Sequence, residues 1–269
     1  SGASCCEGTA AMRRNDAGAM VLLIGGFALW MGLTPTHLLY IKPSMTRWLV
    51  LSGAVLVTVG ALVLILGWRE RRRARAAGTD ARGGEADDHD HHHATRVGWL
   101  LALPLCVAIA VGANPLGSYA AGRQNSQRVL PPGEFDLEQY LTANSFGGQA
   151  PALRSIDYVR ATQDPDQRPL LADQAVTLTG FVVEDPDGHG RSFLLTRFMV
   201  GCCAADALAV QVKVPVRDGP LPEEEAWVQV EGTLDLERSP DPGESLDPPV
   251  VRATAIRPTD EPDEVYEYP

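Results

Sequence analysis

The sequence predicts an α + β membrane protein, in which three N-terminal transmembrane helices precede a small five-stranded β-barrel of the oligonucleotide-binding (OB) type. Three observations lead to this fold class. The first half of the chain contains three apolar runs of membrane-spanning length, the second half contains short segments of alternating apolar and polar residues, and the two halves differ in charge. Residues 134–269 carry 10 basic and 26 acidic side chains, a balance of −16, whereas the whole chain has a net charge of −11.

The membrane domain is expected to cover residues 17–121. A helix needs about 20 apolar residues to cross a hydrocarbon core that is about 30 Å thick. Trp48 and Trp68 bound the second apolar run, which contains no charged residue and places a tryptophan at each membrane interface. The three helices are predicted at 17–41, 48–68 and 97–119, after an N-terminal tail at 1–16.

The distribution of arginines predicts the orientation of these helices. Arg13 and Arg14 precede the first helix, and six arginines follow the second helix between residues 69 and 82. Because cytoplasmic loops carry the excess of Lys and Arg, the N-terminus and the loop 69–96 are expected in the cytoplasm. The C-terminal domain is then extracytoplasmic, and the chain is a multi-pass protein of the cell membrane whose helices contact the lipid bilayer.

The cytoplasmic loop 69–96 shows no apolar periodicity and is predicted to be disordered. It contains His89, His91, His92 and His93 beside acidic residues, and neutral imidazole is a preferred ligand of zinc, nickel and copper. Neighbouring side chains on an extended chain point apart, so these histidines would form a loose, exchanging metal site. The alternative is a solvated polar linker.

The second half of the chain is expected to begin with a connector at 122–174 and to continue as a β-rich extracytoplasmic domain at 175–269. Apolar residues near helical spacing predict one short helix in the connector, which Asp164-Pro165 ends. Alternating apolar and polar residues between Pro- and Gly-containing turns predict five strands. They are placed at 175–184, 192–200, 207–214, 226–234 and 249–256.

The turn between the second and third predicted strands holds Cys202, Cys203 and Asp206. Outside the cytoplasm, adjacent cysteines can be buried thiols, a strained vicinal disulfide or soft metal ligands. Two thiolates aided by a carboxylate, with Asp206 or His189 nearby, suit zinc or copper, so zinc is the candidate cofactor. The alternative is that both cysteines fill a tight turn as small apolar side chains.

Two function classes are not expected. The sequence shows no Ser-His-Asp order, Gly-rich phosphate loop or paired-carboxylate site, which argues against an enzyme. The acidic balance of the C-terminal half repels phosphate backbones, so nucleic acid is not expected as a partner.

Gly25, Gly53 and Gly60 lie within the first two predicted helices. Small residues let helices approach closely, either within the chain or against a partner, so these glycines are candidates both for intramolecular packing and for docking a larger membrane protein. The predicted spans contain no Asp, Glu, Lys or Arg that would mark a path for an ion. The chain is therefore not expected to move a solute by itself.

Six features carry a resemblance to a known family. They are Tyr40-Ile-Lys-Pro43, the His-rich loop, Leu178-Thr-Gly-Phe-Val182, Arg197–Asp206 with its Cys-Cys-Ala-Ala-Asp element, Trp227–Gly232 and Pro262–Tyr266. Through them the chain resembles, over almost its whole length, the YcgQ-type bacterial permease subunits, whose function is uncharacterised. The resemblance implies an accessory subunit of a two-component membrane permease, with a multi-pass permease subunit as partner and a link to divalent metal homeostasis. The alternative is a stand-alone membrane protein that binds or senses a metal.

Overall fold

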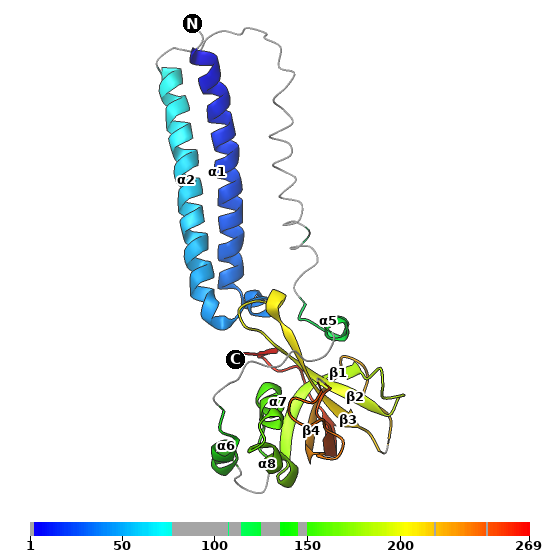
Figure 1. The fold of residues 1–269 in the computed structure, drawn as a ribbon. Coiled ribbons are helices and arrows are strands. Elements are labelled where there is room, and N and C mark those ends of the chain that lie inside the picture. Colours follow the sequence, from blue (N-terminus) through cyan, green and yellow to red (C-terminus); the bar gives the residue numbers. More distant parts are fainter. Residues whose placement is uncertain are drawn as a thin grey trace. The chain divides into compact units, whose positions relative to one another are not determined.

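The computed structural model describes residues 3–76, 107, 114–124, 135–144, 150–217, 219–245 and 247–269 (Figure 1). The chain divides into two compact units. We call Ser1–Leu38 with Pro43–Asn114 the helical unit, and Leu39–Lys42 with Pro115–Pro269 the sheet unit. The short segment Leu39–Lys42 is thus separated along the chain from the rest of its unit.

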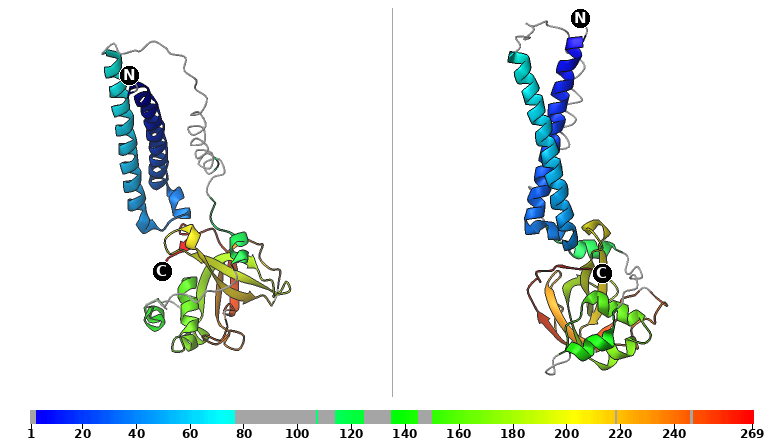
Figure 2. Two further views of the ribbon diagram at one scale, coloured as in Figure 1. Left: turned by 45° about the horizontal axis from the view of Figure 1, so that its top comes forward. Right: turned by 90° about the vertical axis from the view of Figure 1, so that its left-hand side faces the viewer.

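The helical unit contains two long helices that lie side by side, α1 (Ala3–Leu33) and α2 (Thr46–Ala76) (Figures 1 and 2). Helix α1 ends before Pro35, which cannot continue an α-helix, so it stops eight residues short of the predicted end. The 3₁₀ turns η1 (Pro35–Leu39) and η2 (Pro43–Met45) follow. Helix α2 continues past Trp68 because arginine is a good helix former, so part of the predicted loop is helical.

Both long helices are apolar enough to span a membrane, over Asp16–Leu33 in α1 and over Pro43–Arg73, which includes most of α2. Their apolar side chains are largely exposed, for example Leu33 at 75% and Trp48 at 59%. Such exposure distinguishes them from core helices of a water-soluble domain. The predicted third helix at 97–119 lies outside the described residues except for Val107 and residues 114–119, and the four loop histidines lie outside them entirely.

Glycines bring α1 and α2 into close contact. A Cβ atom added at Gly25 would lie 2.7 Å from Leu56 Cβ, and one added at Gly53 would lie 2.9 Å from the backbone nitrogen of Leu29. A Cβ atom added at Gly60 would lie 2.8 Å from the backbone nitrogen of Leu22. These positions therefore serve packing within the chain, and a surface that α2 covers is not open to a partner.

The sheet unit is built on six strands in the order β3-β2-β1-β4-β5, with β6 beside β2. Adjacent strands are antiparallel except for β6, which runs parallel to β2. Five strands match the predicted positions within two residues, and the sixth was not predicted. Their bounds are β1 Val176–Glu184, β2 Ser192–Met199, β3 Leu208–Pro215, β4 Trp227–Leu234, β5 Val251–Pro258 and β6 Tyr266–Glu267.

The closed barrel expected from the sequence is not confirmed, because β3 and β5 do not form a ladder. Among the described residues they are joined only by a bridge between Lys213 and Val250, just before β5. Pro215 ends β3 and has no backbone N–H with which to extend the pairing. The sheet is therefore open between β3 and β5.

The described part of the sheet unit contains four short helices, three of which lie within the segment 122–174 that was predicted as a connector with one helix. Helices α7 and α8 lie beside the sheet, and apolar side chains of α6, α7 and α8 join the main core (Figure 1). Leu137, Ile156 and Leu171 are fully buried there, next to Leu178 and Leu195 of the sheet. The compact unit accordingly begins well before residue 175. The helices are α5 Ser118–Arg123, α6 Leu137–Asn144, α7 Ser155–Gln163 and α8 Arg168–Asp173.

Candidate metal site

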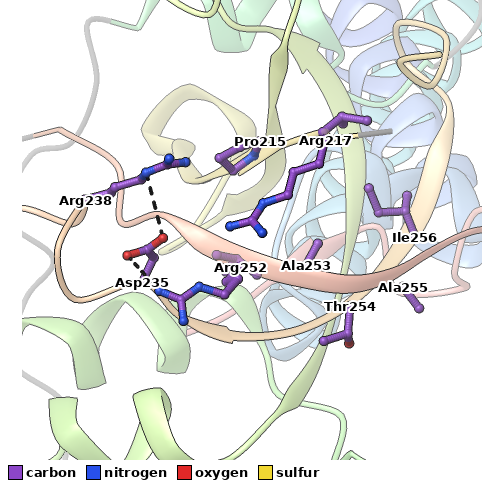
Figure 3. A pocket seen from close by; sticks show the side chains of 11 residues that line it. Pro215, Arg217, Asp235, Arg238, Arg252, Ala253, Thr254, Ala255 and Ile256 are labelled. Atoms are coloured by element: carbon purple, nitrogen blue, oxygen red, sulfur yellow. Dashed lines mark ion pairs between the residues drawn. The ribbon is translucent and has the colours of Figure 1, made fainter. Parts of the chain in front are cut away.

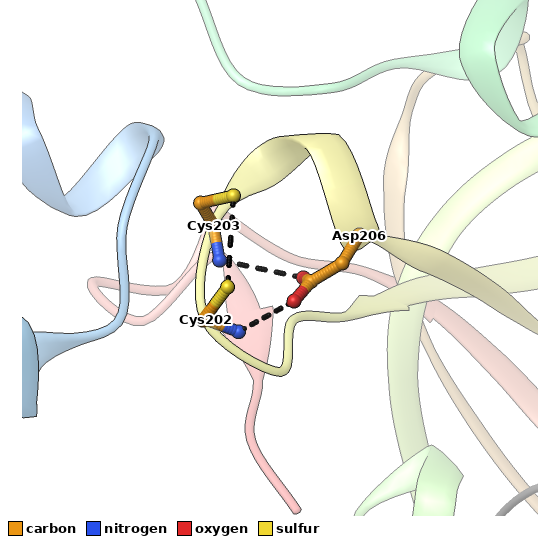
Figure 4. Close-up of side chains that lie close together, drawn as sticks. All are labelled: Cys202, Cys203 and Asp206. Carbon is orange, nitrogen blue, oxygen red and sulfur yellow. Dashed lines mark hydrogen bonds between the residues drawn. The ribbon is translucent and has the colours of Figure 1, made fainter.

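The turn between β2 and β3 is organised around the carboxylate of Asp206 (Figure 4). This carboxylate accepts hydrogen bonds from the backbone N–H groups of Gly201 at 3.0 Å, Cys202 at 2.8 Å and Cys203 at 3.3 Å. Asp206 closes the 3₁₀ turn η3 (Ala204–Asp206), for which Cys203 is the N-cap residue. A carboxylate that gathers three N–H groups curls the backbone, and this brings both cysteine side chains to the same side of the loop.

The structure brings together the three residues that the sequence singled out. The sulfur atoms of Cys202 and Cys203 are 3.7 Å apart and both cysteines are free thiols. One ligand atom from each cysteine and from Asp206 can be chosen so that all three lie within 4.8 Å of one another. Cys202 and Asp206 are exposed and Cys203 is half-buried, so the two thiols are not part of the buried core of the sheet unit.

Contacts within this turn shift the pKa of the Cys202 thiol and of the Asp206 carboxyl. The pKa of the Cys202 thiol is raised to about 11. The largest cause is the hydrogen bond between this thiol and Asp206, and the next is its hydrogen bond with Cys203. Desolvation opposes ionisation of Asp206, but the Cys202 thiol and the surrounding backbone N–H groups together hold the pKa of this carboxyl below its usual range. At neutral pH the turn thus carries a carboxylate next to protonated sulfur.

The segment Leu39–Lys42 supports the backbone of both cysteines. Ile41 forms an antiparallel bridge with Cys203, and the Lys42 N–H donates a hydrogen bond to the Cys202 carbonyl at 3.1 Å. The Ala204 N–H donates to the Tyr40 carbonyl at 2.6 Å. The turn is therefore held from outside by a piece of chain more than 150 residues away. The alternation in Tyr40-Ile-Lys was a signal for extended structure, but its partner could not be inferred from it.

His189 does not take part in this site. It lies in the β1–β2 turn with a φ of 47°, and its Nδ1 is 2.9 Å from the carbonyl oxygen of Asp187. The turn of His189 precedes β2 and the cysteine turn follows it, so the eight residues of the strand separate them by about 26 Å. The idea that His189 is near the cysteines was wrong.

A second polar group, which the sequence did not reveal, is buried at the C-terminal strand β6. The Glu267 carboxylate accepts the backbone N–H groups of Ser155 at 2.8 Å and Ile156 at 2.7 Å, at the start of α7. Arg197 reaches it from β2 with an Nε–Oε1 distance of 3.8 Å, donates to the Glu264 carbonyl at 2.6 Å and lies over the ring of Trp227. Burial raises the pKa of Glu267 and lowers the pKa of Arg197.

These contacts explain why three of the segments that carried the family resemblance belong together. The Arg197 segment, the Trp227 segment and the C-terminal tail meet at one buried ion pair. Both side chains of the ion pair are at least nine-tenths buried and are therefore not accessible to a ligand from solvent. The role of this pair is structural. The side chains of the cysteine turn are, in contrast, exposed or half-buried.

A comparison with known protein families gives a match to part of the sheet unit. Residues 156–269 match the family described as the DUF1980 C-terminal domain. The match includes the cysteine turn, all six strands and the buried pair of Arg197 and Glu267. A search of curated proteins found no match. The match is consistent with the resemblance to YcgQ-type proteins, and it covers the segment from Ile156 to Pro269.

Proposed function

We propose that the sheet unit binds one divalent metal ion, preferably zinc, through Cys202, Cys203 and Asp206. The distance of 3.7 Å between the two sulfur atoms supports this most directly. Zinc–thiolate bonds of about 2.3 Å in a tetrahedral arrangement hold two sulfurs about 3.8 Å apart. A vicinal disulfide would instead require a separation of about 2.05 Å. The sulfurs thus need little movement to accept zinc.

The exposure of the site favours an exchangeable ion over a permanent structural one. Three protein ligands leave a fourth tetrahedral position open, whereas structural zinc sites use four. The unit's acidic surface attracts cations, and the ion must displace the protons from the two thiols, so binding releases protons and reverses on acidification. The proposed role is therefore to hold a metal ion and to pass it on.

Spectroscopy with cobalt(II) as a probe for the zinc site tests this role. We expect the purified full chain to show thiolate-to-cobalt charge-transfer bands that zinc displaces at a stoichiometry of one. The variant Cys202→Ser/Cys203→Ser should lose the bands, while Cys106→Ser keeps them. A variant in which His89, His91, His92 and His93 are replaced by alanine serves as a second control, because it cannot bind cobalt through the loop histidines and should keep the thiolate bands. Unchanged bands in the double cysteine variant would refute the site.

We further propose that the whole chain is the accessory subunit of a two-component permease. The resemblance to YcgQ-type proteins and the exposed apolar surface of α1 and α2 support this role. No described residue lies within 4 Å of a Cβ atom added at Gly26, unlike at Gly25, so Gly26 is a small residue of α1 that α2 does not cover. Pull-down of a multi-pass permease from native membranes, lost in Gly26→Leu, is the expected result. Metal binding by a chain that captures no such partner would favour the stand-alone metal-binding protein instead.

The proposed topology places the sheet unit outside the cytoplasm. Leu39–Lys42 connects α1 to α2 along the chain and belongs to the sheet unit. If both helices cross the membrane, their connection and the sheet unit share one side, and the arginines after α2 mark the other side as cytoplasmic. Reporter fusions after Arg75 and after Pro269 should report opposite sides, and the same side for both would contradict this topology.

A further inference from the structure

The opening between β3 and β5 contains a cavity of about 350 Å³, which begins at the end of β3, whereas the cysteine turn precedes that strand. One wall is the outer edge of β5, from Val251 to Ile256, and the other is Pro215 to Arg217 (Figure 3). This volume suits a small ligand, since small-molecule sites begin at about 300 Å³. The cavity exists because the isolated bridge between Lys213 and Val250 does not continue into a ladder between the two strands.

Three arginines line this cavity in a unit that is otherwise strongly acidic. Arg217 follows β3, Arg238 follows β4, and Arg252 lies on β5. They are three of only ten basic residues between 134 and 269, against 26 acidic ones. Asp235 is the one carboxylate in the lining, which gives the cavity a formal charge of +2. Because this part of the chain has far more acidic than basic residues, its overall composition does not account for a positively charged cavity.

The carboxylate of Asp235 positions two of the three arginines. It is buried, with Oδ1 3.3 Å from Arg252 Nη2 and Oδ2 4.0 Å from Arg238 Nε. Arg217 has no carboxylate within ion-pair distance among the described residues, and Figure 3 shows its guanidinium directed between Pro215 and Arg252. An anion in the cavity would relieve the repulsion among these groups.

The backbone adds to this positive character. Strand β5 is the last strand of the order β3-β2-β1-β4-β5, so its outer edge faces the cavity without a strand partner along Ala253–Ile256. The exposed edge of a sheet offers N–H donors to anions, and the planar guanidinium fork matches the oxygens of carboxylates and phosphates. Both kinds of donor line the same cavity.

We propose that the opening between β3 and β5 is a binding site for a small dianion with carboxylate or phosphoryl oxygens. Arg217 and Arg252 hold the anion from opposite walls, and Arg238 contributes from the rim. The charge of +2 favours a dianion over a chloride ion, and the cavity volume excludes a folded macromolecule. This site is independent of the proposed metal site.

Calorimetry on the full chain in phosphatidylcholine nanodiscs, with inorganic phosphate and citrate as probes, tests the proposal. We expect saturable binding of at least one probe and a loss of affinity of about tenfold in Arg217→Ala, which removes one charge-assisted contact. Arg217→Lys should retain part of the affinity. Arg257→Ala is the matched control, because this β5 arginine pairs with Glu231 and does not line the cavity. Cys202→Ser/Cys203→Ser should bind as the unsubstituted chain does.

Two outcomes would overturn the proposal. One is the absence of saturable binding of both probes, and the other is an equal effect of Arg217→Ala and Arg257→Ala. A comparison with nanodiscs of phosphatidylglycerol shows whether the anion that occupies the cavity is a lipid headgroup or a free anion. If the headgroup occupies the site, the apparent affinity for phosphate falls in these nanodiscs, and Arg217→Ala removes the difference.

Discussion

Glu267 caps helix α7 at Ile156, with its Oε2 atom 2.7 Å from the backbone nitrogen of that residue. A second oxygen of the same carboxylate accepts the N–H of Ser155. Two residues more than 100 positions apart thus connect the beginning and the end of the segment that matches the DUF1980 C-terminal domain. A negative charge at a helix N-terminus is also favoured by the helix dipole.

Glu267→Ala is expected to destabilise the domain by about 3 kcal/mol, because it removes two hydrogen bonds and leaves the Arg197 guanidinium buried without a carboxylate. Hydrogen exchange of the α7 amides, followed by mass spectrometry, measures this loss as weaker protection. Glu264→Ala is the control, since Arg197 contacts only the backbone carbonyl of that exposed residue. Equal protection in both variants would show that the cap contributes little.

Asp185 is expected to make stability depend on acid pH. Although desolvation opposes ionisation, the Lys213 ammonium at 2.8 Å and the Ser192 hydroxyl hold the pKa of this carboxyl below its usual range. A depressed folded-state pKa contributes stability that is present above the unfolded value of about 3.9 and is lost as the pH falls through the folded value. Asp185→Asn should therefore cost about 1–2 kcal/mol at pH 7 and nearly nothing in strong acid.

Unfolding of Asp185→Asn at several pH values checks this dependence. The exposed neighbour Asp187 provides the control, because only its backbone N–H bonds to Asp185. Asp187→Asn should leave the profile unchanged. A constant difference between Asp185→Asn and the unsubstituted chain from pH 7 to pH 2 would contradict the assigned pKa direction.

The Cys202 thiol is expected to react slowly with iodoacetamide at neutral pH in metal-free protein. Its pKa of about 11 leaves little thiolate, and the thiolate is the reactive form. Asp206→Asn removes the negative charge, lowers the thiol pKa towards its ordinary value and should accelerate alkylation several-fold. Peptide-resolved mass spectrometry over a range of pH gives the rates. Slower alkylation in Asp206→Asn would contradict the role of the carboxylate.

Gly25→Leu is expected to destabilise the pairing of α1 with α2 by about 2 kcal/mol, since even a Cβ at this position would meet Leu56 at 2.7 Å. Gly26→Leu should leave the pairing of α1 with α2 unchanged, because no described residue lies within 4 Å of a Cβ there. Thermal denaturation of the two variants in detergent compares adjacent positions with the same substitution. If both variants melt alike, the close helix contact is not a source of stability.

Periodicity was sufficient to place the five long strands and the two described apolar helices. It could not place β6, because a two-residue strand has no period and Glu267 is a residue type that is normally exposed. It could not show that β3 and β5 fail to pair, since closure depends on where strands lie in space. It also assigned α6 and α8 to a connector, although Leu137 and Leu171 are core residues.

The residue types of the candidate site could be predicted from the sequence, but the backbone contacts that hold the cysteine turn could not. Adjacent cysteines followed by Asp206 indicated metal chemistry, and the structure adds that the carboxylate also organises the backbone of the turn. The bridge from Ile41 to Cys203 is a long-range pairing that no local pattern encodes. The arginine cavity was equally hidden, because Arg217, Arg238 and Arg252 have no common spacing.

The assignment of Leu39–Lys42 to the sheet unit has a practical consequence for biochemical work. A water-soluble fragment that starts at Pro115 would lack the peptide that receives the Ala204 N–H and donates to the Cys202 carbonyl. It would also lack the Leu39 carbonyl that accepts the Tyr266 hydroxyl at 3.1 Å. Metal affinities measured on such a fragment would describe a loosened turn. Supplying a peptide of residues 37–44 in trans, or joining it to the fragment by a linker, would restore the missing backbone partner.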